Sequence, residues 1–158
     1  MTEPSTPEPT PHYLGLDVGA RRVGVAVSSP DAGFALPVET VDVRHARVGA
    51  QRIVGMMRER AITHIVVGWP LNLEGKTGRA TQRVEKFLRE LQVQMKRSLE
   101  DPDSIEIIRW DERLTTTAAE SFLISEDVSR SRRKEVVDQV AATHILNSFL
   151  SSLPTASA

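Results

Sequence analysis

The sequence predicts an α/β fold in which a mixed five-stranded sheet carries helices on its faces. Short apolar segments typical of strands alternate with longer segments whose apolar residues recur at helical spacing. The early strands are joined by short turns, which favours antiparallel pairing, and the later ones are separated by helices, which favours parallel pairing. The chain of 158 residues, 40% hydrophobic and 26% charged, suits one globular domain.

The first part of the chain predicts three strands and a helix. Residues 13–18 and 22–29 are apolar segments joined by GARR, and valines alternate with small residues in the second, so we expect a β-hairpin. A third strand follows the SPDAG turn at about 34–43. Apolar residues at helical spacing then predict a helix over 45–61.

The second part predicts two more strands and three helices. THIVVGWP (63–70) is continuously apolar, as in a strand buried on both faces. An amphipathic pattern predicts a helix over 79–97, and the segment EDPDS ends it before a strand at 105–110. We expect a helix over 115–125, then a basic loop, and a last helix over 134–152.

Composition restricts the class of protein. The absence of cysteine excludes disulfides, thiolate metal sites and a thiol nucleophile. No apolar run approaches the roughly 20 residues of a membrane span, and the N-terminus lacks the pattern of a signal peptide. We therefore expect a cytoplasmic protein that acts without a membrane. Residues 1–12 and 154–158 are expected to be tails, with one domain over 13–153.

Three acidic positions fall at one edge of the expected sheet. Asp17 ends the first strand, Asp111 and Glu112 follow the strand at 105–110, and Asp138 begins a core-facing stripe of the last helix. Taken singly, Asp17 fits a turn-bonding aspartate, the DER acids fit surface charge, and Asp138 fits an acid in a first helical turn. Taken together they indicate a site for Mg²⁺ or Mn²⁺, because these ions prefer oxygen ligands.

Basic residues gather near these acids. In such a position they indicate contacts to nucleic-acid phosphates, although each cluster alone also fits solvated surface charge. The four histidines share no ligand spacing, so we expect no histidine-rich zinc site. The candidate phosphate-binding residues are Arg21, Arg22, Lys76, Arg79, Arg113, Arg130, Arg132, Arg133 and Lys134, and Arg83, Lys86 and Arg89 extend the middle cluster.

Four stretches carry a resemblance to a known family: LGLDVGARRVGVAVS, IVVGWPLNLEGKTG, WDERLTT and DQVAATHIL. In this order the chain resembles the YqgF/RuvX family, described as Holliday junction resolvases or pre-16S rRNA nucleases. The resemblance implies a ribonuclease-H-like fold with strand order 3-2-1-4-5. It implies metal-binding catalytic acids at Asp17, at Glu112 (with Asp111 as the alternative) and at Asp138.

The resemblance implies a metal-dependent nuclease, for which we expect structured RNA as the substrate and branched DNA as the alternative. The sequence does not distinguish a monomer from a homodimer. Two other classes compete with this interpretation. A sugar-kinase-like or actin-like ATPase shares the first phosphate loop but needs two such domains, and a non-catalytic nucleic-acid-binding module would share the fold.

Overall fold

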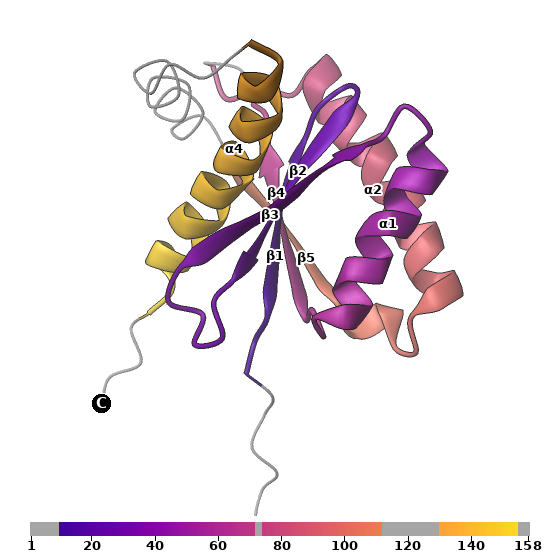
Figure 1. Ribbon diagram of the computed structural model, residues 1–158, viewed down its shortest axis with the longest axis vertical. Helices are drawn as coiled ribbons and strands as arrows, with labels where there is room; N and C mark the ends of the chain where they lie inside the picture. The colour runs from indigo at the N-terminus through magenta and orange to yellow at the C-terminus, as the bar shows by residue number, and fades with distance from the viewer. Residues whose placement is uncertain (1–9, 72–73, 112–129, 155–158) are drawn as a thin grey trace, which may run out of the picture.

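The computed structural model describes residues 10–71, 74–111 and 130–154, and it confirms the α/β fold (Figure 1). One five-stranded sheet lies between two helical layers. Helices α1 (Ala46–Glu59) and α2 (Arg79–Ser98) pack on one face, and α4 (Arg130–Ser152) packs on the other. The strands are β1 (Tyr13–Val18), β2 (Arg22–Ser28), β3 (Ala35–Asp42), β4 (His64–Trp69) and β5 (Glu106–Asp111), and a short 3-10 helix, η1 (Pro102–Ser104), precedes β5.

The strand order is β3-β2-β1-β4-β5, as the family resemblance implies. β1 pairs antiparallel with β2, and β2 pairs antiparallel with β3, whereas β4 pairs parallel with β1 and with β5. The carboxyl ends of β1, β4 and β5 therefore meet at one edge of the sheet, which we call the carboxyl edge. The opposite edge, where these strands begin at Tyr13, His64 and Glu106, is the amino edge.

Side-chain alternation divides the interior into two cores. Leu14, Leu16 and the valines of β2 face α1 and α2. Tyr13, Ala26 and Val66 face α4 instead and join the apolar stripe of that helix. The expected stripe is confirmed, since Ala141, Ala142, Ile145 and Phe149 are all buried. The same alternation puts Gly15 and Asp17 on the α4 face of β1.

The start of α4 corrects one prediction. We expected a basic loop at 129–135 before a helix at 134–152, but the helix begins at Arg130. The helix therefore includes the four basic residues Arg130, Arg132, Arg133 and Lys134. This segment contains no glycine or proline, and arginine, lysine and glutamate are strong helix formers, so the helix extends through it. Asp138 consequently lies eight residues after the first residue of α4, beyond the first turn in which the helix dipole acts.

Some predicted segments lie partly or wholly outside the described residues. The predicted helix at 115–125 is one of them, as are residues 1–9 and 155–158 of the predicted tails. Within the predicted N-terminal tail, His12 donates a backbone hydrogen bond to Oγ1 of Thr63 at 2.9 Å. Across the part of the chain that the structure describes, no helix combines the length and apolarity needed to cross a membrane.

Candidate active site

Asp17 lies on the α4 face of the sheet, between glycines of the two neighbouring strands. It is half-buried in β1, and its directly paired residue on β2 is Gly24. On the other side, Leu16 pairs with Val67, so the next residue of β4, Gly68, continues the register beside Asp17. Neither of these two neighbours carries a side chain that would cover Asp17 from the adjacent strand.

Gly24 also allows α4 to approach this position. A Cβ atom built on Gly24 would lie 1.8 Å from the backbone oxygen of Asp138, far inside any permitted contact. The backbone of α4 at Asp138 therefore rests directly on β2 beside Asp17. The neighbouring helix residue, Gln139, donates a 3.3 Å hydrogen bond to Oγ1 of Thr40, the residue of β3 that pairs with Gly24.

Asp138 meets Arg22 at this contact. Nε of Arg22 is 3.1 Å from Oδ2 of Asp138, and the two side chains are 37% and 22% exposed. This atom pair is an ion pair by distance, but its angles are not those of a hydrogen bond. Oδ2 is buried and, among the described side chains, stands out as a buried polar atom without a hydrogen-bond partner.

Burial raises the pKa of the Asp138 carboxyl above its ordinary value, and the charge of Arg22 opposes this only in part. The negative charge of the Asp138 carboxylate is therefore poorly solvated, and the positive charge of Arg22 balances it only in part. Such a group favours additional positive charge at Oδ2. Perturbed acids of this kind are concentrated at functional sites.

The DER segment contributes one described acid. Asp111 is exposed at the end of β5, where alternation puts Ile108 and Trp110 on the α4 face and Arg109 and Asp111 on the face of α2. Asp111 thus points to the side of the sheet opposite Asp17. Glu112 and Arg113 lie outside the described residues, so their predicted roles stay predictions.

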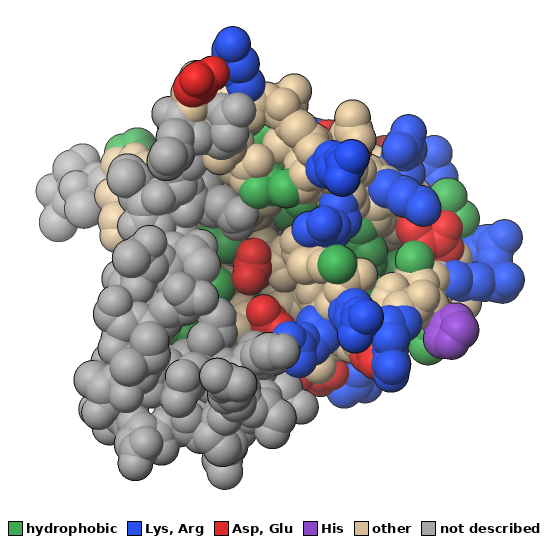
Figure 2. All heavy atoms as spheres, turned by 90° about the horizontal axis from the view of Figure 1, so that it is seen from above, with side chains coloured by type: hydrophobic (Ala, Val, Ile, Leu, Met, Phe, Trp, Pro, Cys, Tyr) green, Lys and Arg blue, Asp and Glu red, His purple; other side chains and the backbone are tan. Residues whose placement is uncertain are grey.

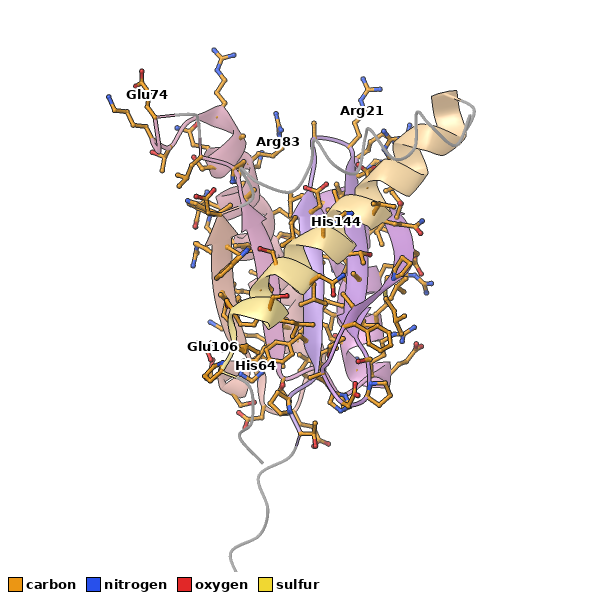
Figure 3. All side chains as sticks on the ribbon, turned by 90° about the vertical axis from the view of Figure 1, so that its left-hand side faces the viewer. Arg21, His64, Glu74, Arg83, Glu106 and His144 are labelled. Carbon is orange, nitrogen blue, oxygen red and sulfur yellow. The ribbon has the colours of Figure 1, made fainter. Side chains whose placement is uncertain are left out.

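Basic side chains surround the carboxyl edge on the side of α2 (Figure 2). Arg21, in the β1–β2 turn, and Arg83, on α2, both point away from the sheet at this edge (Figure 3). Arg79 is exposed at the start of α2, and exposed Lys76 is 3.6 Å from Glu74. Arg22 differs from these because it faces Asp138. The side chains of Arg130, Arg132, Arg133 and Lys134 lie outside the description.

The donor set fits a hard divalent cation in part. Asp17 and Asp138 supply carboxylate oxygens on one face of the sheet, and the buried Oδ2 of Asp138 has no hydrogen-bond donor. Within the described residues, no cluster of three acidic, histidine or cysteine side chains could hold a metal ion. The fit therefore rests on two described acids and on the third that the DER segment is predicted to supply.

Sequence reasoning missed Gly24 and the partner of Asp138. A glycine inside an alternating strand often marks a close backbone approach, so VGVAV contained the signal for Gly24. No comparable signal pairs Arg22 with Asp138, because they are 116 residues apart and meet only through α4 packing.

Comparison with known proteins agrees with this geometry. The family described as RuvX, Holliday junction resolvase, matches residues 11–152. The chain belongs to the RuvX family. A relative in Halalkalibacterium halodurans is 42% identical over 87% of this chain and 94% of its own length, and one in Geobacillus thermodenitrificans is 39% identical over 88% and 96%. Both are named "Putative pre-16S rRNA nuclease". The family description and the names of these relatives together identify the chain as a nuclease.

Solved structures show that RuvX shares its fold with junction resolvases. Thermus thermophilus RuvC in complex with a Holliday junction superposes with a TM-score of 0.57 at 11% identity, covering 90% of this chain and 97% of that one. The fowlpox virus Holliday junction resolvase superposes with a TM-score of 0.53 at 16% identity, covering 90% and 99%. At such identities the likeness establishes the ribonuclease-H-like fold alone.

Proposed function

We propose that this RuvX protein hydrolyses phosphodiester bonds of structured RNA with the help of Mg²⁺ or Mn²⁺, and that its reaction is the 5′-end processing of pre-16S rRNA. The observation that carries this proposal is the Gly24 contact, which brings Asp138 of α4 onto the sheet beside Asp17. The names of the curated relatives favour the RNA substrate.

The three acids of the proposed site share one task. Asp17, Asp138 and Glu112 would hold one or two divalent ions, which would supply an activated water and charge neutralisation at the phosphate. Asp17 is positioned by β1, and its pairing with Gly24 lets the backbone of α4 lie close to it. Asp138 is positioned by the α4–β2 contact. Asp111 is the weaker candidate for the third acid, because it occupies the opposite face.

The cations of the carboxyl edge hold the substrate backbone. Arg21, Arg79 and Arg83 are exposed there, so they can exchange water for phosphate oxygens at little cost. Lys76 and the basic start of α4 are candidates for the same role, and so is Arg113. Phosphate contacts of this kind fix the position of the substrate without reading its sequence.

The branched-DNA alternative has one specific observation in its favour, namely the family description as a Holliday junction resolvase. Resolution of a junction needs two symmetric cuts and therefore a homodimer. Cleavage of an RNA precursor needs only one active site. A monomer in solution would therefore favour the RNA substrate over the DNA junction.

One experiment tests both substrates. The purified protein with Mn²⁺ is offered a structured pre-16S rRNA fragment and a four-way DNA junction side by side, and Asp17→Asn serves as the inactive control. We expect cleavage of the RNA by the wild type alone. Cleavage of only the junction would favour the DNA alternative, and cleavage of neither, at any Mn²⁺ concentration, would favour a non-catalytic binding module.

A further inference from the structure

The contact between Arg22 and Asp138 differs from the other arginine–carboxylate pairs of the described chain. Arg52 donates to both oxygens of Glu39, at 3.1 and 2.7 Å, and Arg44 donates from Nε to both oxygens of Asp42. Arg109 donates from Nε to Oε1 of Glu85 at 2.7 Å. Arg22 instead approaches Asp138 to 3.1 Å without hydrogen-bond alignment. Those three pairs have hydrogen-bond geometry, whereas the pair of Arg22 and Asp138 is held mainly by charge.

Arg22 and a metal ion would compete for the same carboxylate. The α4 face near Gly24 carries the carboxylates of Asp17 and Asp138, and the guanidinium of Arg22 lies beside Oδ2 of Asp138. A divalent cation bound at this oxygen would repel the guanidinium, because like charges in close contact disfavour one another. A phosphate bound together with the cation would offer the guanidinium another anion.

Arg22 is placed to leave Asp138 without unfolding anything. It is the first residue of β2, next to the β1–β2 turn, and 37% of its side chain is exposed. Its backbone is held by pairing with Asp42, so only the side chain has to rotate. A guanidinium that leaves a carboxylate finds an equivalent partner in phosphate, because both anions match its planar fork of donors.

We propose that Arg22 is an exchangeable counter-ion of the active site: it neutralises Asp138 before metal binding and passes to the substrate phosphate when Asp138 becomes a metal ligand. The inference rests on the metal site of the proposed function. It assigns to Arg22 a role different from that of the exposed cations Arg21 and Arg83, for which we propose phosphate contacts alone.

The test uses Mn²⁺ as the probe and the unfolding midpoint of the full-length chain as the readout. Arg22→Gln removes the competing charge, so half-saturation should occur at an Mn²⁺ concentration lower by about fivefold or more, since two unit charges about 4 Å apart interact appreciably even in water. Arg21→Gln is the matched control. It removes the same charge from the adjacent exposed residue and should shift half-saturation much less.

Cleavage of the RNA precursor at saturating Mn²⁺ provides the second readout. Arg22→Gln should cleave at least about tenfold more slowly than the wild type although it binds Mn²⁺ more tightly, because it loses a charge-assisted contact to the phosphate. Arg22→Lys keeps the positive charge and loses the planar donors of the guanidinium. Its Mn²⁺ half-saturation and its cleavage rate should therefore lie between those of the wild type and of Arg22→Gln. It also takes the place of Arg22→Gln if that variant does not fold.

Three results would overturn the inference. If Arg22→Gln binds Mn²⁺ no more tightly than the wild type, Arg22 does not compete with the metal for Asp138. If Arg22→Gln cleaves at the wild-type rate, Arg22 does not contact the substrate phosphate. If Mn²⁺ raises the midpoint of the wild type no more than that of Asp138→Asn, the metal site itself fails and the inference falls with it. The last result differs visibly from the first two, in which the wild type still binds Mn²⁺ through Asp138.

Discussion

At the amino edge of the sheet polar side chains satisfy one another, whereas at the carboxyl edge a buried carboxylate oxygen has no hydrogen-bond donor. Thr63 accepts a hydrogen bond from the backbone of His12 and contacts Nδ1 of His64 at 2.7 Å. The other ring nitrogen of His64 lies 3.5 Å from Glu106, at the end of the molecule opposite Arg21 and Arg83 (Figure 3).

This difference distinguishes polar groups that stabilise the fold from polar groups that are available to bind a ligand. A polar group whose partners lie within the protein contributes to stability and gains nothing from a ligand. A buried polar atom that lacks a hydrogen bond lowers stability unless a ligand supplies the missing interaction. The amino edge belongs to the first class, and Asp138 at the carboxyl edge belongs to the second.

The largest expected effect follows from neutralising Asp17. Asp17→Asn keeps the shape of the side chain but removes the charge that holds the metal. Cleavage should fall by more than about a thousandfold, because a catalytic metal contributes several kcal/mol and each 1.4 kcal/mol or so is tenfold. The unfolding midpoint without metal should stay equal or rise slightly, since repulsion between carboxylates is relieved. Wild-type cleavage rates would contradict the catalytic assignment, and a large loss of stability would support a turn-bonding role.

Gly24→Ala is expected to damage the carboxyl edge through packing. Its Cβ would overlap the backbone oxygen of Asp138, so α4 must shift and the free energy of unfolding should fall by about 1–3 kcal/mol or more. Urea denaturation measures this loss. Gly55→Ala is the matched control, because nothing lies within 4 Å of its Cβ and alanine should stabilise α1 by about 0.5–1 kcal/mol. Equal effects of the two substitutions would contradict the close contact at Gly24.

A substitution at the amino edge should change stability alone. Thr63→Val removes the hydroxyl that joins His12 to His64 and leaves their groups without that partner, so the free energy of unfolding should fall by about 1–3 kcal/mol. Thr63→Ser keeps the hydroxyl and should restore most of it. Cleavage by the folded protein should equal that of the wild type in both variants. A selective loss of cleavage in Thr63→Val would break the distinction between the two edges.

The pKa of Asp138 gives the smallest effect, seen as pH dependence. The pKa of Asp138 is raised in the folded state, so the folded protein binds the proton more tightly than the unfolded chain does. The free energy of unfolding therefore falls as the pH rises from the ordinary pKa of 3.8 through the raised one. Asp138→Asn should therefore be more stable than the metal-free wild type at neutral pH. The difference should shrink as the pH is lowered toward the ordinary value of 3.8. A variant less stable than the wild type at neutral pH would show that Arg22 compensates Asp138 fully.

The fold and the stripe of α4 were predictable because each depends on local pattern. Valine alternation in β2 and the spacing from Ala141 to Phe149 report which face of an element is buried, and the structure confirms both. The start of α4 was predicted wrongly because charge was given more weight than helix propensity in a segment without glycine or proline.

The candidate site was predictable only as a set of residues at one edge. The ends of β1 and β5 determine where Asp17 and Asp111 lie along the sheet, but the pleat determines which face each occupies. The Arg22–Asp138 contact depends on how closely α4 approaches β2, which no local pattern encodes. The types of residue therefore indicated a metal site, and the packing of α4 on the sheet determined which side chains meet.

A crystal of the protein soaked in Mn²⁺ tests the central claim most directly. Anomalous scattering identifies the ion, and the distances to Asp17 and Asp138 decide whether the carboxyl edge is a metal site. We expect a peak with oxygens of both residues within about 2.0–2.6 Å, the usual range for carboxylates on such ions. Full occupancy elsewhere, with both carboxylates more than about 3 Å from any peak, would contradict the claim.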